Sequence, residues 1–206
     1  MTIEQIRVGF DNFCYLIFCQ RKKKAAFVDP GYNYTDLIKL ISKKDLILDY
    51  IIATHYHFDH TGCINQIKKT YPNSKIIASE LDGSQLDAKV DIKVSDNENI
   101  RLGDINLKFI LTPGHTPGGI CIIVDNESLL TGDTLFIGDC GRTDLLGGSL
   151  NQMFKTLQEK IMPLPDNLIV YPGHNYGDKP FDSLGNQKKT NKTLLAKNIK
   201  EFSKIT

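Results

Sequence analysis

The stretch Asp49-Tyr-Ile-Ile-Ala-Thr-His-Tyr-His-Phe-Asp-His-Thr-Gly62 joins an apolar run to a dense polar motif. The apolar residues predict a buried β-strand, and within six residues after it come four potential metal ligands, His55, His57, Asp59 and His60. Open α/β sheets bind ligands at the carboxyl ends of their strands. Because His55 and His57 alternate by two, they can point the same way, whereas Asp59 and His60 begin the next segment. One loop can therefore serve two metal ions.

The remaining histidines reinforce this interpretation. The chain has five, and the two outside the motif, His115 and His174, each follow a Pro-Gly pair at the end of an apolar run. A Pro-Gly turn fixes the direction of the next side chain. A lone histidine is more often a surface or packed residue, but such residues would be scattered along the chain. The pattern therefore predicts that all five histidines form one metal site.

Composition and charge narrow the class of protein. A chain of 206 residues can bury one sizeable core and is short for two, so residues 1–206 are expected to form a single domain. The net charge of +1 gives no basic track for nucleic acid, and the basic run 21–24 is expected to be a hairpin turn. The N-terminus lacks a signal-peptide pattern and no apolar run is long enough to span a membrane, which predicts a cytoplasmic protein. The sequence leaves the oligomeric state open.

The cysteines favour buried thiols over disulfides. They are odd in number, show no Cys-x-x-Cys spacing and mostly lie in apolar segments: Cys14, Cys19, Cys63, Cys121 and Cys140. Cys63 and Cys140 lie near the motifs in sequence, and a thiol role for either is the minor alternative.

Apolar patterning predicts two halves. The first has an α/β rhythm: a strand hairpin at 13–28, an amphipathic helix at 34–44, the strand of the motif at 49–53, a second helix at 62–70 and a short strand at 75–78. The second is expected to contain short, largely antiparallel strands at 105–111, 119–124 and 128–131. A helix that starts at Ser149 (149–160), a last strand (167–171) and a terminal helix (186–205) follow.

Polar residues end several of these strands. Asp133 could cap a helix, but Gly132 beside it permits a close backbone approach and an inward turn. Asp29 is equally consistent with a turn residue and with a carboxylate that orients a ligand histidine. The candidate ligands are therefore His55, His57, Asp59, His60, His115, Asp133 and His174. Imidazoles and carboxylates suit zinc, iron or manganese, and a bridging carboxylate lets two cations lie about 3.5–4 Å apart, where a bound water becomes a nucleophile.

Four motifs carry a resemblance to a known family: Thr54–Gly62, Thr112-Pro-Gly-His-Thr-Pro-Gly118, Leu130-Thr-Gly-Asp-Thr134 and Tyr171-Pro-Gly-His-Asn-Tyr176. Over almost its whole length the chain resembles the metallo-β-lactamase superfamily and, within it, the glyoxalase II thiolester hydrolases. The resemblance implies a four-layered αβ/βα sandwich with two divalent ions, zinc first, at one edge. It implies that His55, His57 and His115 hold one ion, that Asp59, His60 and His174 hold the other, and that Asp133 bridges them. A metal-bound hydroxide would attack the thiolester beside the catalytic carboxylates Asp59 and Asp133, and Tyr176 would contact the thiol substrate.

Two departures from that group leave the substrate open. The chain ends before the longer helical region with which glutathione-using members bind their substrate, so glutathione is not expected. The segments 138–145 and 185–191 look closer to the persulfide dioxygenases, in which equivalents of His55, His115 and Asp133 hold one iron. Arg142 could contact the carboxylate of a thiol substrate or simply pair with Asp144. The leading hypothesis is a metal-dependent thiolester hydrolase; the alternatives are an iron persulfide dioxygenase and a non-catalytic metal-binding protein.

Overall fold

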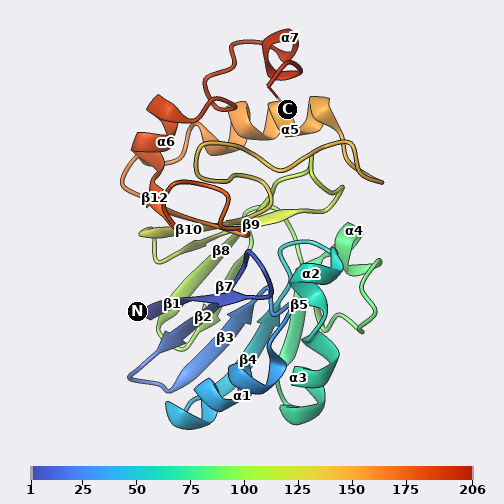
Figure 1. Cartoon of the computed structure of the whole chain (residues 1–206). Coiled ribbons are helices and arrows are strands. Elements are labelled where there is room, and N and C mark those ends of the chain that lie inside the picture. Colours follow the sequence, from blue (N-terminus) through green and yellow to red (C-terminus); the bar gives the residue numbers. More distant parts are fainter. Residues whose placement is uncertain (1, 206) are drawn as a thin grey trace.

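The computed structural model describes residues 2–205, which form two six-stranded sheets packed face to face (Figure 1). The first sheet has the strand order β1-β2-β3-β4-β5-β6, with antiparallel pairing up to β3 and parallel pairing beyond it. Its strands are β1 (Thr2–Val8), β2 (Asn12–Cys19), β3 (Lys24–Val28), β4 (Ile47–Ile52), β5 (Lys75–Ser79) and β6 (Ile92–Val94). Residues 21–23 of the basic run lie in the β2–β3 hairpin turn, as predicted, and Lys24 begins β3.

The second sheet has the order β12-β11-β10-β9-β8-β7 and is antiparallel except where β10 pairs with β11. Its strands are β7 (Asn99–Leu102), β8 (Ile105–Leu111), β9 (Ile120–Val124), β10 (Ser128–Gly132), β11 (Ile169–Pro172) and β12 (Asp182–Ser183). The predicted largely antiparallel second half is confirmed.

Helices cover the outer face of each sheet (Figure 1). Outside the first sheet lie α1 (Tyr34–Lys43) and α3 (Ile64–Thr70); outside the second lie α5 (Leu150–Thr156), α6 (Leu184–Thr190) and α7 (Ile199–Phe202). Two short helices, α2 (Phe58–Thr61) and α4 (Glu80–Gly83), follow β4 and β5. Ser149 caps α5, and a π-helical turn, η1 (Leu157–Ile161), continues it. The four layers confirm the αβ/βα sandwich.

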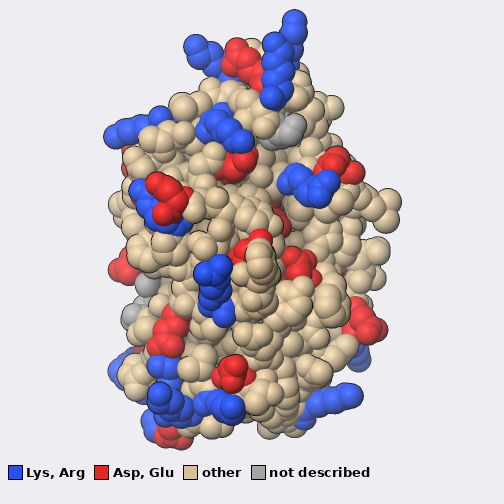
Figure 2. All heavy atoms as spheres, viewed as in Figure 1, with Lys and Arg blue, Asp and Glu red and all other residues tan. Residues whose placement is uncertain are grey.

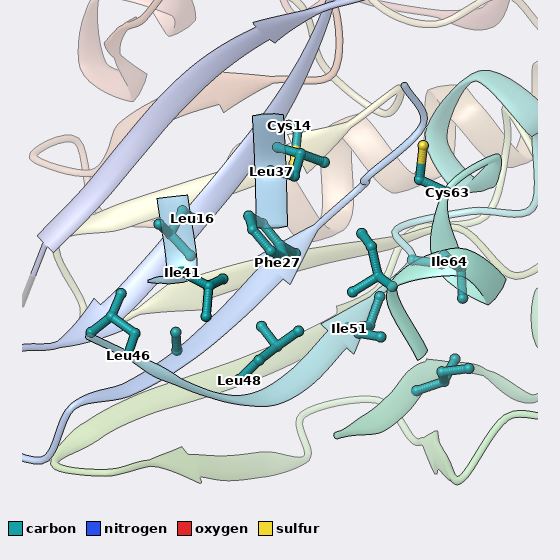
Figure 3. Packing of buried hydrophobic residues seen from close by; sticks show 14 of the residues in the cluster. Cys14, Leu16, Phe27, Leu37, Ile41, Leu46, Leu48, Ile51, Cys63 and Ile64 are labelled. Carbon is teal, nitrogen blue, oxygen red and sulfur yellow. The ribbon is translucent and has the colours of Figure 1, made fainter. Parts of the chain in front are cut away.

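The packing follows from the two-residue period of the strands. In β2, Phe13, Tyr15 and Ile17 face the second sheet, whereas the intervening Cys14 and Leu16 face the outer helices. In Figure 3, Leu37 and Ile41 of α1 lie over Leu16 and Phe27. Each such fully buried large apolar side chain stabilises the fold by roughly 1.5–3 kcal/mol. This double-sided burial explains why the central strands β2, β9 and β10 are fully buried along their length.

Several elements differ from the sequence prediction. The short strands β6, β7 and β12 and the short helices α2 and α4 were not predicted, and two further differences have a clear physical cause. The edge strand β1 was not predicted, because its residues are mostly half-exposed and give it no apolar period. The tail forms two short helices rather than one terminal helix. Asn191 ends α6: its amide donates to the backbone oxygens of Phe136 and Asp139, and its side-chain oxygen accepts from Thr193. No helix within residues 2–205 is both long and apolar enough to cross a membrane.

Candidate metal centre

Loops at one edge of the sandwich bring together all seven predicted ligand residues. The segment after β4 carries His55 and His57, and α2 carries Asp59 and His60. From the second sheet come the residues that follow β8, β10 and β11, namely His115, Asp133 and His174. The site therefore draws on both sheets, and no single strand could build it.

The ligand atoms fall into two groups. The side-chain nitrogens of His55, His57 and His115 all lie within 4.8 Å of one another, and so do the ligand atoms of Asp59, His60 and His174. A third such cluster, Asp29 with His55 and His60, shares members with both groups.

Asp133 lies between the two groups. One carboxylate oxygen is 3.5 Å from His115 Nε2 and 3.3 Å from His174 Nε2, and the other is 3.4 Å from His60 Nε2. A carboxylate in this place faces both groups and has the geometry of a bridge.

Three of the histidines are held through Nδ1, which leaves Nε2 facing the centre. His60 Nδ1 lies 3.1 Å from Asp29 Oδ2, His174 Nδ1 lies 3.2 Å from Asp11 Oδ1, and His115 Nδ1 lies 2.7 Å from the backbone oxygen of Arg142. An Nδ1–H that donates to an oxygen fixes the tautomer and orientation of a ligand imidazole. Asp29 therefore has the geometry of the orienting carboxylate; it is also a left-handed turn residue, with φ 54°, that accepts from Thr54.

The centre fits a bound cation on its own geometry. His55 Nε2 and Asp133 Oδ1 are buried and make no hydrogen bond to any other residue in 2–205. His57 Nδ1 and His115 Nε2 face each other at 3.0 Å, as do His60 Nε2 and His174 Nε2 at 3.1 Å. Buried polar atoms are costly without partners, and converging imidazole lone pairs repel unless a proton or a cation lies between them.

The pKa shifts divide the centre into two halves. Burial, together with neighbouring imidazoles, holds the pKa of His55 and His57 below the usual value, so these rings are neutral. Burial would also lower the pKa of His174, but Asp133, Asp59 and Asp11 outweigh it and raise that pKa to about 10. Burial would raise the pKa of Asp133, yet the surrounding histidines lower it and keep the carboxylate ionised. The pKa of His60 is raised as well, because Asp133, Asp29 and Asp59 outweigh the effect of burial. A cation that binds the acid-rich half would therefore have to displace histidine protons.

Glycine is required at two positions beside Asp133. Gly132 has φ +47°, and a Cβ there would lie 2.4 Å from Thr54 Oγ1. A Cβ on Gly173 would lie 2.3 Å from Asp133 Oδ1 and 2.9 Å from His60 Cε1. The Gly132 geometry agrees with the close approach expected from the sequence, and Gly173 leaves open the space that the ligands face.

Sequence reasoning missed three residues that hold the centre. Asp11 contacts His174, and Asn12 Nδ2 donates to Asp59 Oδ2 at 2.9 Å. Asp82, which is 2% exposed, accepts from Thr116 Oγ1 and from the Gly118 amide, both at 2.6 Å. Asp11 lies in a hairpin turn, Asn12 is the first residue of β2 and Asp82 lies in a four-residue helix, so none of the three has a sequence pattern that marks a metal site. Only the fold shows what they contact.

A cavity of about 760 Å³ opens onto the centre and includes both predicted substrate residues. Tyr176 stacks on the His174 ring at 4.7 Å with an interplanar angle of 8°. Arg142 makes a two-pronged ion pair with Asp144, at 2.7 and 2.8 Å, which is the pairing that the sequence left open. Cys140 also lines the cavity, but burial raises the pKa of its thiol to about 12. All five cysteines are buried and free, as predicted.

Charge over the surface shows no single-sign field on the face in Figure 2, where basic and acidic side chains are interspersed. This agrees with the net charge of +1.

The fold and the clustered ligands define a metal-binding protein of the αβ/βα sandwich class. The chain belongs to the metallo-β-lactamase superfamily, whose profile matches residues 7–174. The match confirms the resemblance to this superfamily of metallo-hydrolases that the four motifs indicated.

Relatives within the superfamily differ in reaction. The chain is 33% identical over 183 residues to the probable polyketide biosynthesis zinc-dependent hydrolase BaeB of Bacillus velezensis, covering 88% of this chain and 81% of that protein. It is 36% identical over 177 residues to the hydroxyacylglutathione hydrolase of Pelagibacter ubique (85% and 72%), and 31% identical over 196 residues to the human mitochondrial persulfide dioxygenase ETHE1 (94% and 75%). The crystal structure of ETHE1 from Myxococcus xanthus superposes with a TM-score of 0.88 at 26% identity, covering 98% of this chain and 88% of that one.

Proposed function

We propose that this chain is a thiolester hydrolase that uses two divalent metal ions. Zinc is the preferred metal in this proposal, and iron and manganese are the alternatives. The observation that carries the proposal is the completeness of the second ligand group. Asp59, His60 and His174 each have an outer partner of their own, in Asn12, Asp29 and Asp11. Such outer partners orient ligands and raise metal affinity. A site for one ion would not need them.

The residues have distinct roles in this proposal. His55, His57 and His115 would hold one ion, Asp59, His60 and His174 the other, and Asp133 both. When bound, the ions would lower the pKa of water toward neutrality and polarise the thiolester carbonyl. The catalytic carboxylates Asp59 and Asp133 have lowered pKa values and so stay ionised, because neighbouring histidines outweigh the effect of burial. In the ionised form they would hold the cations beside the reacting bond, while Tyr176 and Arg142 line the cavity that the substrate would enter.

A second candidate is an iron persulfide dioxygenase, supported by the likeness to the two ETHE1 proteins. In that reaction, His55, His115 and Asp133 would hold a single iron. A metal-binding protein without turnover is the third candidate.

Metal analysis combined with two assays tests the proposal. We expect two zinc ions per chain and cleavage of a thiolester. One iron per chain with oxygen uptake on a persulfide would favour the dioxygenase, and tightly bound metal without either activity would favour the third candidate. The variant His57→Ala separates the first two: it removes a ligand of the two-ion site and should abolish hydrolysis, but it leaves the three proposed iron ligands in place.

A further inference from the structure

The cavity beside the metal centre has an apolar wall that begins at a ligand. The Tyr176 ring lies flat on His174, and Phe136 packs edge-on against both, with ring centroids 5.0 Å from Tyr176 and 5.8 Å from His174. Ile137 continues this wall, and Phe58 and Leu145 also line the cavity. A group that extends from the centre along this wall therefore meets aromatic and aliphatic surface first.

Several of these side chains are exposed although they are apolar. Phe58 is 72% exposed, Tyr176 57% and Leu145 38%. Two further exposed side chains, Phe10 at 89% and Leu146 at 90%, are adjacent in sequence to Asp11 and Leu145. The segment of Leu145 and Leu146 is held against the loop of His55 and His57, because Tyr56 Oη in that loop donates to the backbone oxygen of Leu146. Exposed apolar side chains that line a cavity, as Phe58, Leu145 and Tyr176 do, mark a ligand site more often than scattered exposed ones do.

The cations of the cavity are already neutralised. Apart from the histidines, the cationic residues that line it are Arg142 and Lys192. Arg142 pairs with Asp144, and Lys192 Nζ lies 2.7 Å from Asp139 Oδ2. An anionic substrate would have to displace a carboxylate from one of these pairs. An uncharged substituent meets no such cost.

We infer that the preferred substrate is a thiolester that carries an uncharged apolar chain, which lies along the wall formed by Phe136, Ile137, Leu145 and Tyr176. This inference rests on the proposed function and adds the class of substrate. The chain can belong to the acyl group or to the thiol, since both extend from the same reacting bond.

Two series of thiolesters test the inference. One extends the acyl group from acetyl to octanoyl on N-acetylcysteamine, a neutral thiol; the other keeps the acetyl group and extends an alkyl thiol. Transfer of each methylene from water to an apolar wall should raise kcat/KM by roughly two- to fourfold, in whichever series carries the chain along the wall. A flat or falling profile in both series would overturn the inference.

Variants connect the effect to the wall. In Leu145→Gln, the increase in kcat/KM from the shortest to the longest substrate of the responsive series should be at least fivefold smaller than in the wild type. The matched control is Leu195→Gln, which alters a leucine that is 50% exposed outside the cavity and should keep the wild-type profile. A profile that is unchanged in Leu145→Gln, or equally lost in Leu195→Gln, would overturn the assignment of the wall. A rate for the glutathione ester at least tenfold above that of its neutral counterpart, lost in Arg142→Gln, would also contradict it.

Failure of the proposed function can be told apart from failure of this inference. If zinc- and iron-loaded protein cleaves no thiolester, the hydrolase proposal fails. Calorimetric binding of non-hydrolysable thioethers then tests the wall alone. An octyl thioether that binds at least tenfold more tightly than its methyl analogue, with the difference reduced in Leu145→Gln, supports the apolar site, and equal binding overturns it.

Discussion

Asp82 is a buried carboxylate that ties together two loops of the metal centre. It accepts from Thr116 Oγ1 and Gly118 N, on the turn that carries His115, and the backbone amide of Tyr56 favours its ionised form. Tyr56 lies between His55 and His57, so Asp82 holds the segments of all three histidines in the first ligand group. We predict that Asp82→Ala loosens this group.

The size of the effect follows from the burial of the site. The variant leaves two buried donors without an acceptor, at a cost of roughly 1–3 kcal/mol each. Part of this cost is offset, because burial raises the pKa of Asp82 and shows that its ionised form is itself unfavourable in the folded chain. A net loss of about 2 kcal/mol in the free energy of unfolding would lower Tm by about 4–8 °C in a chain of this size. Loss of a residue that orients a metal ligand typically weakens metal affinity by about 10- to 100-fold.

Thermal unfolding of chelator-treated protein measures the first effect, and zinc titration against a chromophoric chelator measures the second. Asp87→Ala is the matched control, since Asp87 is exposed in the same region. Thr116→Val, which removes one of the two donors and keeps the side-chain volume, should show a weaker form of both effects. If Asp82→Ala keeps the wild-type Tm and zinc affinity, Asp82 does not hold the first ligand group in place. A lower Tm with unchanged zinc affinity would leave Asp82 a purely structural role.

Three further predictions concern the centre and its cavity. Gly173→Ala places a methyl group 2.3 Å from Asp133 Oδ1. The displaced carboxylate would no longer be oriented, so zinc affinity should fall by at least about tenfold in the same titration. Wild-type affinity would contradict this geometry. Zinc binding to chelator-treated protein at pH 7 should release protons, because the pKa of about 10 keeps His174 protonated there until the metal displaces the proton; calorimetry in buffers of different ionisation enthalpy measures the release, and a buffer-independent heat would count against it. The Cys140 thiol, with a pKa near 12, should resist iodoacetamide at pH 7.5 in the folded protein and react in urea, as followed by mass spectrometry; rapid labelling of the native protein would show that the thiol is not buried as described.

The sequence was informative wherever a residue type and a local pattern coincide. The apolar run 49–53 and the Pro-Gly-His turns identified strands and the side chains at their ends, because both signals lie within a few residues of one another. Local patterns could not identify β1, whose place at the sheet edge depends on pairing with β2 rather than on its own burial. They also could not anticipate the break at Asn191, which is caused by carbonyl groups of a loop 52–55 residues away.

The residues that sequence reasoning missed share one physical property. Asp11 and Asp82 do not face the centre directly; each carboxylate holds a segment or a ring that does, and Asp29 does the same for His60. A ligand can be recognised by its chemistry, because few residue types bind zinc or iron. An orienting carboxylate has no such signature, since aspartate in a turn is common for reasons unrelated to metal. Its role depends on a contact between segments far apart in the chain: Asp11 and His174 are separated by 163 residues. Two chains with identical ligand motifs can therefore differ in metal affinity through these carboxylates, and comparing Asp11→Ala with Asp82→Ala would show how much each ligand group depends on its own support.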